Sequence, residues 1–321
     1  MLIPGRIRAA IRGAALLALL GSCPARLPAQ AADAALPVRE VAAGVFLHQG
    51  KPLAPDAPGH EDIANIGFIV GSRCVAVIDT GGSVRVGRAL RASVRSHTHL
   101  PVCYVINTHV HFDHVLGNLA FVADKPRFIG HENLAPALTR SREFFLTHYA
   151  QDLDAPATAA EIVAPTQSVA LDAETELNLG GRVLRLHAWP RAHTDCDLTV
   201  YDSATRTLWT GDLLFVQRTP ALDASLTGWL AVMDSLGQLQ GRVGHVVPGH
   251  GAAGDDLSAA LGPQRRYLRG LLDEVRGEIA HGDSLEEALK RARAPQASPW
   301  QLWDETHPRN VARAYQELEW E

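Results

Sequence analysis

The stretch "INTHVHFDHVLGNLAF" (106–121) places three histidines and an aspartate within six positions, directly after an apolar run. In the extended end of a strand, side chains two apart point the same way, so His109 and His111 share one side. The chain must then turn, which brings Asp113 and His114 to a second position. Imidazole nitrogen and carboxylate oxygen are ligands of Zn²⁺ and similar first-row metals, so this spacing indicates a metal site.

Two histidines do not complete a tetrahedral site, and the remaining ligands must come from elsewhere in the chain. Three further donors follow apolar runs and stand beside Gly, Thr or Pro, in "RAHTD", "WTGDLLF" and "VVPGHG". Loops at strand ends are where rigid scaffolds carry binding and catalytic residues. The sequence therefore predicts two neighbouring sites: His109, His111 and His193 for one metal, Asp113, His114 and His250 for the other, and Asp212 bridging both.

The motifs "THVHFDH", "AHT", "TGD" and "PGHG", in this order, resemble those of the metallo-β-lactamase superfamily. The resemblance runs from about residue 38 to about residue 251. It implies an α/β fold of the αββα four-layer sandwich type and two Zn²⁺ ions, with iron or manganese left open. All seven ligand positions of the glyoxalase II-like pattern have matching residues here.

One branch of that superfamily is more similar than the others. The chain resembles the exported quinoprotein relay system zinc metallohydrolases related to SoxH, through "IANIGFIVG", "VIDTGGS", "HVLGN", "GHENLA", "HTDCDLTVYD" and "GDLLFVQRTPALDASLTGWL". This resemblance suggests a periplasmic quinoprotein partner and says more about location than about substrate.

Two metals a few Å apart share a water and lower its pKa towards about 7, and the hydroxide attacks a carbonyl or a similar electrophile. Asp113 both ligates and orients this hydroxide, which makes it the expected catalytic residue. We expect a zinc-dependent hydrolase of a small ester, thioester, lactone or lactam. Two alternatives stay open: a mononuclear iron oxygenase of persulfides, and a non-catalytic metal-binding partner of a quinoprotein system. A β-lactamase subclass with cysteine at the place of Asp212 is disfavoured.

Other polar residues have weaker signals. Asp79 in "VIDTGG" ends a strand, where it either orients ligand histidines or caps a turn. His131 in "GHEN" either lines the pocket or caps the following helix, and Arg218 either meets an anionic substrate group or is a solvated loop charge. Cys196 is expected to pack in the interior. Six histidines have no ligand spacing and are expected at the surface: His97, His99, His148, His187, His281 and His307.

The N-terminus differs from the rest of the 321 residues. Three arginines precede the apolar run of residues 14–20, which is too short to span a bilayer, and no acidic residue occurs before Asp33. With "AQA" at 29–31 as the cleavage site, residues 1–31 are predicted to be a signal peptide, and the protein periplasmic or secreted. "LGSC" offers lipidation of Cys23 as a second route.

Charge and composition restrict the partners. The formal net charge is −5, and cleavage after residue 31 would bring it to −9, because four arginines and no acidic residue are removed. An acidic net charge does not indicate the basic surface that nucleic-acid-binding proteins have. About 46% of the residues are apolar, enough for a full core, and no other run suggests a membrane span.

The elements that must position the donors occur twice in the same order, strands and then helices. We expect strands in "VREVAAGVFLHQG", "IANIGFIVGSRCVAVIDTGGS" and "PVCYVINT", a hairpin around Gly-Gly in "ELNLGGRVLRL", and strands in "DLTVYDSATRTLWTGDLLF" and "VGHVVPGHG". The loop 51–64 is long and hints at a flap beside the site. Cys74 and Cys103 lie in strand-like runs and are taken as buried hydrophobes, with a bridge between them left open.

Helices are expected at 83–95, 134–147, 226–239, 264–281 and 310–319. Two β–α halves packed together give one αββα sandwich. Residues 32–321 are therefore predicted to be a single hydrolase domain of the metallo-β-lactamase fold, with its C-terminal helices from about residue 255.

Overall fold

The computed structural model describes residues 1–2, 34–153, 162–171, 173–294 and 298–320. Internal contacts separate residues 1–32 from a compact unit of residues 33–321, and the description that follows concerns this second unit. The expected cleavage site and Cys23 lie outside the described residues. Within the described residues, no helix is both long and apolar enough to cross a membrane.

The first sheet contains seven strands in chain order: β1 (Arg39–Ala42), β2 (Val45–His48), β3 (Ile66–Val70), β4 (Val75–Ile78), β5 (Val102–Ile106), β6 (Arg127–His131) and β7 (Gln167–Val169). β1 to β4 pair antiparallel, and β4 to β7 pair parallel. The carboxyl ends of β4, β5 and β6 therefore meet at one edge of the sheet. β4 is buried along its whole length, as its unbroken apolar run requires.

The second sheet contains the remaining strands: β8 (Glu174–Asn178), β9 (Val183–Ala188), β10 (Leu198–Asp202), β11 (Thr207–Phe215) and β12 (His245–His250). β8 and β9 form the expected hairpin, and Gly180 and Gly181 at its turn have φ of 91° and 68°, where glycine is favoured. β11 and β12 pair parallel, so their carboxyl ends also lie at a common edge.

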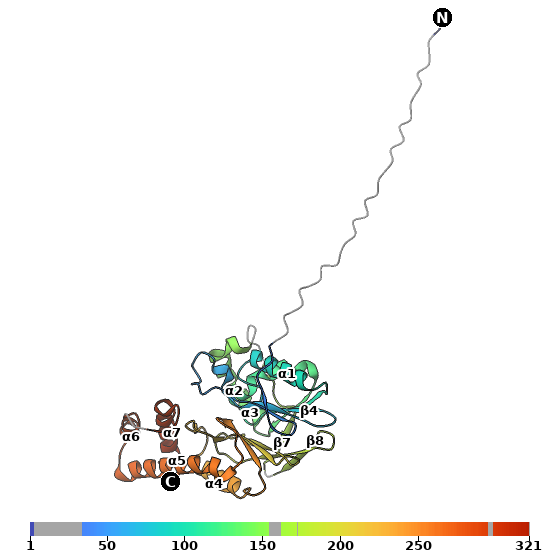
Figure 1. Ribbon diagram of the computed structural model, residues 1–321. Helices are drawn as coiled ribbons and strands as arrows, with labels where there is room; N and C mark the ends of the chain where they lie inside the picture. Colours follow the sequence, from blue (N-terminus) through green and yellow to red (C-terminus); the bar gives the residue numbers. More distant parts are fainter. Residues whose placement is uncertain (3–33, 154–161, 172, 295–297, 321) are drawn as a thin grey trace. The chain divides into compact units, whose positions relative to one another are not determined.

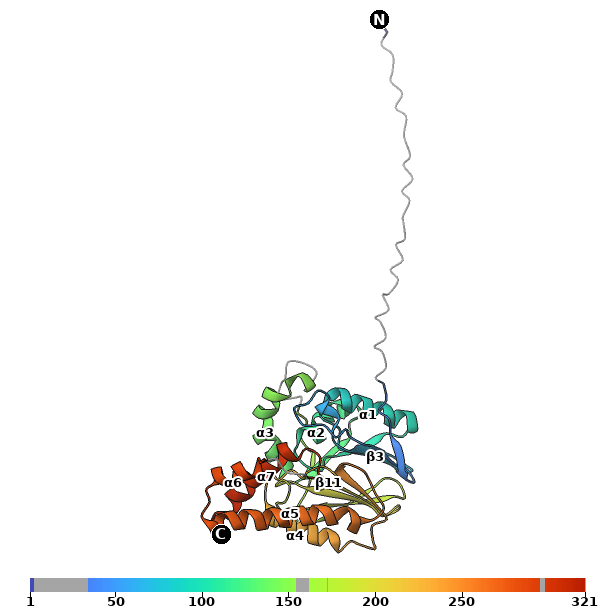
Figure 2. The same cartoon turned by 60° about the vertical axis from the view of Figure 1, so that its left-hand side comes forward.

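The helices cover the two outer faces. α1 (Val84–His97) lies over the first sheet, and α4 (Leu226–Gly237) and α5 (Leu257–His281) lie over the second, as Figures 1 and 2 show. α6 (Leu285–Ala292) and α7 (Trp303–Leu318) pack beside α5. The connections carry α2 (Phe112–Val115), α3 (Leu134–His148), η1 (His60–Asp62), η2 (Leu116–Asp124) and η3 (Ala150–Leu153). The two facing sheets with helices outside them confirm the expected αββα sandwich.

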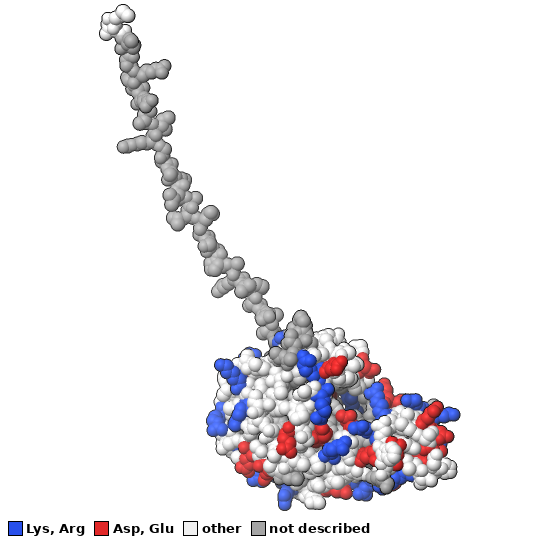
Figure 3. Space-filling model, turned by 180° about the vertical axis from the view of Figure 1, so that it is seen from behind, with Lys and Arg blue, Asp and Glu red and all other residues white. Residues whose placement is uncertain are grey.

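Each layer has its own apolar filling. Between the sheets, a cluster of fully buried side chains joins both inner faces, including Ile69, Ile106, Leu186 and Val200. Other clusters fill the space between each sheet and its helices. Because the sheets are fixed by this packing, the loops at their edges start from well-defined positions. On the face shown in Figure 3, acidic and basic side chains are interspersed.

Several details differ from the sequence expectations. α5 begins at Leu257, earlier than expected, because the side chain of Asp256 accepts a hydrogen bond from the backbone N–H of Ala259 and caps the helix there. α6 was not expected and starts with a capping box at Ser284. His307 is buried, 3% exposed, and stacks on Trp303, so its expected surface position is wrong.

The cysteines also differ from the favoured expectation. Cys74 and Cys103 form a disulfide with their Cα atoms 5.8 Å apart, because the neighbouring strands β4 and β5 bring them together. The alternative that the sequence left open is therefore the one that the structure has. Cys196 is free and buried, as expected.

Candidate metal centre

The histidine-rich stretch lies at the carboxyl end of β5. His109 follows the strand, His111 stands at the N-terminal boundary of α2, and this single helical turn carries Asp113 and His114. The turn expected from the sequence is thus a short helix. It brings the side chains of Asp113 and His114 to a second position beside His109 and His111.

The other donors come from the second sheet. His193 lies in the loop between β9 and β10, Asp212 lies within β11, and His250 is the last residue of β12. In the sandwich, the part of the second sheet that carries these three residues lies opposite the carboxyl end of β5. Donors far apart in the sequence therefore become neighbours. Their potential ligand atoms form two compact groups: His109, His111, His193 and Asp212 in the first, and Asp113, His114 and His250 in the second, with all atoms of a group within 4.8 Å of one another.

Asp212 lies between the two groups. Its Oδ2 is 3.5 Å from Nε2 of His193 in the first group and 3.2 Å from Nε2 of His250 in the second. Its Oδ1 is 3.2 Å from Nε2 of His114. One carboxylate therefore faces both groups, as a bridging ligand would.

Close packing of the backbone makes this position of Asp212 possible. A Cβ atom on Gly249 would lie 1.8 Å from Oδ1 of Asp212, far inside van der Waals contact. Only glycine fits at this place in β12, beside the carboxylate on the neighbouring strand. Gly249, the first glycine of "PGHG", thus leaves the space that the Asp212 carboxylate occupies, a role that depends on the packing of two strands.

Hydrogen bonds determine which ring nitrogen of each histidine carries the proton. A backbone carbonyl only accepts, so Nδ1–H of His193 donates to Ala221 O at 2.6 Å, and Nδ1–H of His250 donates to Ile63 O at 2.8 Å. Nδ1–H of His114 donates to the carboxylate of Asp79 at 2.8 Å. In each of these rings Nε2 is left with a lone pair that points into the centre.

The two remaining rings follow the same logic. Oγ1 of Thr108 donates to Asp79 at 2.8 Å and can accept from Nδ1–H of His109 at 3.1 Å. Nε2 of His111 lies 3.5 Å from Oδ2 of Asp223, which leaves its Nδ1 as the free lone pair. All five histidines thus have one nitrogen facing an outer acceptor and the other directed inward, the arrangement of metal-ligating histidines.

Several inward atoms have no hydrogen-bond partner. Nδ1 of His111 and Nε2 of His193 are 3.1 Å apart, and when the outer nitrogen of each neutral ring carries the proton, two lone pairs face each other there. Nε2 of His109, Nε2 of His114 and Oδ1 of Asp212 are buried without any hydrogen bond among the described residues. Buried polar atoms are rarely unpaired, and facing lone pairs repel unless a cation lies between them. The donor set therefore fits divalent metal ions.

The close histidines and carboxylates of the centre shift one another's pKa values. Burial, with His114 next in effect, holds the pKa of His109 well below its usual value, and burial with His111 lowers the pKa of His193 to about 4. Burial raises the pKa of Asp212, but the histidines around it, His250 first, outweigh burial and hold that pKa well below normal. Burial lowers the pKa of His111 and His114 as well, but the neighbouring carboxylates, Asp223 for His111 and Asp212 for His114, outweigh burial and raise the pKa of both rings. A metal binds neutral imidazoles and ionised carboxylates, so it would replace the protons that these two rings carry.

The outer residues lie at different distances from the centre. Asp79 is 1% exposed and accepts from the backbone N–H and Oγ1 of Thr108 and from His114, so it connects both ends of the motif. Arg218 is buried with a guanidinium nitrogen 3.1 Å from Nδ1 of His250. Nδ1 of His131 accepts from Asn133 N, and its Nε2 contacts a backbone carbonyl, so backbone groups occupy both nitrogens.

Asp223 was not identified from the sequence. The hydrogen bond from His111 lowers the pKa of Asp223 to about 2. Its loop is held by α7, because Arg313 donates to the Asp223 carbonyl at 2.7 Å and Asn310 accepts from the next backbone N–H upstream, Leu222 N. The sequence signal for Asp223 is its place in the loop between the "TGD" motif and the next helix, because this loop must pass the metal centre.

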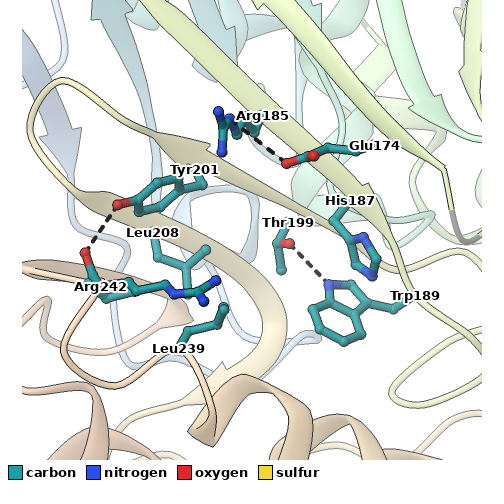
Figure 4. Close-up of a pocket in the computed structure, with 10 residues that line it drawn as sticks. Glu174, Arg185, His187, Trp189, Thr199, Tyr201, Leu208, Leu239 and Arg242 are labelled. Atoms are coloured by element: carbon teal, nitrogen blue, oxygen red, sulfur yellow. Dashed lines mark hydrogen bonds and ion pairs between the residues drawn. The ribbon is translucent and has the colours of Figure 1, made fainter.

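A pocket lies on the outer face of the second sheet, and it is separate from the metal-binding donors. Figure 4 shows Arg185, Trp189, Tyr201 and Arg242 around it, and its volume is about 240 Å³. The Tyr201 hydroxyl donates to the Arg242 carbonyl, and the Trp189 indole N–H donates to Thr199. None of the seven donor residues lines this pocket.

A four-layer αββα sandwich with two His/Asp donor groups at one edge defines a class of metal-binding α/β proteins. The model of the metallo-beta-lactamase superfamily matches residues 60–255, a span that contains all seven donors. The chain belongs to the metallo-beta-lactamase superfamily. No curated protein matches the chain.

Solved structures agree with this fold. A metallo-beta-lactamase from Pontibacter korlensis is 20% identical with a TM-score of 0.59, and the match covers 73% of this chain and 99% of that one. The stereoselective inverting sec-alkylsulfatase Pisa1 from Pseudomonas sp. is 17% identical with a TM-score of 0.63, covering 88% of this chain and 50% of the sulfatase. At these identities the similarity concerns the fold alone.

Proposed function

We propose that this protein is a binuclear zinc hydrolase that uses a metal-bridging hydroxide on an ester, thioester, lactone or lactam. One observation carries the proposal: the carboxylate of Asp212 lies between two compact donor groups, and Nε2 of His109, Nε2 of His114 and its own Oδ1 have no hydrogen-bond partner among the described residues. When bound, two such ions lower the pKa of a shared water towards about 7 and polarise the substrate oxygen.

The residues of the chain would divide the remaining work. His109, His111 and His193 would hold one ion, Asp113, His114 and His250 the other, and Asp212 both. Oδ2 of Asp113 lies 3.3 Å from Nε2 of His250, beside the bridging position, where it would ligate and also orient the water. Asp79 would hold His114 and Thr108 in place.

Metal analysis of the purified mature protein tests this function. We expect two zinc ions per chain and loss of hydrolysis after chelation, measured on a panel of thioesters, lactones and β-lactams. A secondary alkyl sulfate belongs in the panel because one structural relative is named for that activity. One iron per chain would instead support a persulfide oxygenase, and no metal would support a non-catalytic partner of a quinoprotein system.

Asp212→Ala is the sharpest variant for the bridging role. Because it removes the one carboxylate shared by both groups, we expect poor retention of both metals and loss of hydrolysis by at least about 100-fold. Asp234→Ala on the exposed face of α4 is the matched control and should keep two metals. An Asp212→Ala protein with two metals and normal turnover would refute the bridging assignment.

We also propose export to the periplasm or outside the cell, with cleavage after residue 31, and membership of the SoxH-like branch. The Cys74–Cys103 disulfide supports export, since disulfides persist in oxidising compartments. Cell fractionation and the mass of the mature N-terminus test it. A chain starting at residue 32 supports the signal peptide, a lipidated Cys23 supports the lipoprotein route, and an uncleaved cytosolic chain contradicts both.

A further inference from the structure

The outer pocket, on the outer face of the second sheet, is shaped by the register of the strands (Figure 4). Its lining residues in β9 and β10 are alternate residues, so their side chains share the face that points away from the first sheet. Cross-strand pairing places Tyr201 beside Arg185 of β9 and Leu208 of β11. It also places Thr199 beside His187. The positions of these five side chains therefore follow from the sheet itself.

The inner surface of the outer pocket is apolar and fixed by packing. Trp189, Leu208 and Val243 are largely buried and belong to the apolar cluster between the second sheet and its helices. The Trp189 indole N–H donates to Oγ1 of Thr199 at 3.0 Å, so this polar atom needs no partner from outside. What the indole offers a ligand is its ring, which favours contact with an apolar group, above all an aromatic one.

The opposite wall of the outer pocket is the turn that follows α4. Arg242 N donates to Leu239 O at 2.9 Å, and the Tyr201 hydroxyl donates to Arg242 O at 3.0 Å, so the turn is closed and attached to β10. Nε of Arg206 donates to the same carbonyl at 2.8 Å. Figure 4 shows Leu239 and Arg242 on this side of the pocket and Trp189 on the other. Because both walls are fixed before a ligand arrives, little has to be ordered when it binds.

Charged groups lie on two sides of this apolar surface. On the β8 side, Nε of Arg185 lies 3.2 Å from Glu176 and 3.8 Å from Glu174, so these charges balance within the protein. On the side of the turn, Arg242 and Arg206 are both exposed. Among the described residues, Glu174 is the one acidic residue of the lining, and it lies on the β8 side. The side of the turn is therefore cationic, which favours an anionic group there.

We propose that the outer pocket binds a small aromatic carboxylate, with its ring on the apolar surface around Trp189 and its carboxylate at the guanidinium of Arg242. The volume of about 240 Å³ is below the range of drug-sized sites, which begins at about 300 Å³, so the ligand is small. A guanidinium holds a carboxylate through two parallel N–H donors. A cationic ligand would be repelled by the side of the turn, and a neutral one would form no ion pair with Arg242.

Calorimetric titration of the metal-loaded protein with 2-naphthoate tests the proposal. The uncharged 2-naphthamide measures the contribution of the carboxylate, and cyclohexanecarboxylate measures that of the flat ring. We expect saturable binding of 2-naphthoate and binding of each of the other two compounds that is weaker by at least about 5-fold. No saturable binding of 2-naphthoate, or equal affinities for the three compounds, would overturn the proposal.

Arg242→Gln tests the position of the carboxylate. The side chain of Arg242 is exposed, so the fold should tolerate its replacement. We expect this variant to bind 2-naphthoate at least about 5-fold more weakly and 2-naphthamide as the wild type does. Arg269→Gln, an exposed arginine of α5, is the matched control and should change neither affinity. An unchanged affinity of Arg242→Gln for 2-naphthoate would overturn the proposed ion pair.

Leu239→Trp provides a second, independent variant that fills the outer pocket. Leu239 is half-buried at the pocket, so a larger side chain there can occupy the space of the ligand ring. We expect binding of both naphthalene compounds to weaken at least about 10-fold, with an unchanged content of metal and an unchanged melting temperature. Wild-type affinity in this variant would place the compounds elsewhere, at the metals for example, and would overturn the proposal. The outer pocket contains none of the seven metal-binding donors, so this result does not depend on the proposed hydrolase function.

Discussion

The role of Asp79 provides a test that separates metal binding from folding. Its carboxylate accepts three hydrogen bonds at 2.8 Å, from Thr108 N, Thr108 Oγ1 and His114 Nδ1, in a fully buried position. In Asp79→Asn, one oxygen still accepts from Thr108 N. The new NH₂ group then faces Thr108 Oγ1, a hydroxyl that can rotate, and the His114 N–H, which cannot accept.

The expected magnitude follows from these contacts. Losing the partner of one ligating histidine typically weakens metal binding 10–100-fold, and tenfold is about 1.4 kcal/mol. Asparagine also tolerates the left-handed backbone of residue 79, where φ is 53°, so the fold should survive. Asp79→Ala would instead leave three buried donors unpaired, each at a cost of about 1–3 kcal/mol, and should lose stability as well.

Zinc titration of the metal-free protein against a competing chelator measures the effect. We expect the site of His114 to bind zinc 10–100-fold more weakly in Asp79→Asn, with the other site changed less than about 3-fold. Asp234→Asn, exposed on α4, serves as the control. Two unchanged zinc affinities in Asp79→Asn, with an unchanged melting temperature, would refute the reasoning.

Three further outcomes are expected. Asp223→Asn should weaken zinc binding at the site of His111 about 10-fold, which is the low end of the usual range, because the Asp223 side chain is exposed. An unchanged zinc affinity would show that Asp223 does not support His111 as a ligand. Burial lowers the pKa of His48, but its hydrogen bonds to Asp62 and Pro37 outweigh burial and raise that pKa. The charged His48 therefore stabilises the fold fully below the unfolded pKa of 6.5, and this contribution is lost as the pH rises through the raised folded pKa. We expect the urea midpoint of His48→Gln to lie furthest below that of the wild type at pH values under 6.5, and the two midpoints to converge at higher pH. A difference between the midpoints that does not change with pH would contradict this. Replacing Cys74 and Cys103 by serine should cost about 2–4 kcal/mol in urea unfolding, and an unchanged midpoint under oxidising conditions would argue against the bridge.

The sequence predicted the main architecture because local patterns carry it. Strand-like apolar runs and the Gly-Gly turn were read correctly, since period-two burial and positive φ leave clear marks in composition. α6 was missed although its sequence carries a helix signal, the capping box of Ser284 and Glu287 followed by Leu285, Ala288, Leu289 and Ala292 at helical spacing. The helix is only eight residues long and buries only two alanines, so it adds little to the core. His307 was misplaced because its burial depends on Trp303 and Tyr267, which reach it only in the folded protein.

By itself, the sequence determined which side chains are available for a metal centre, because ligand chemistry depends on residue type and each donor follows a recognisable strand. Tertiary structure decided how these donors meet. The facing edges of two sheets bring Asp212 between both groups, and distant carbonyls such as Ile63 O and Ala221 O set the ring protons of His250 and His193. The burial of Arg218 beside His250 is likewise a property of the assembled fold, because the strand that carries His250 reaches it only after folding.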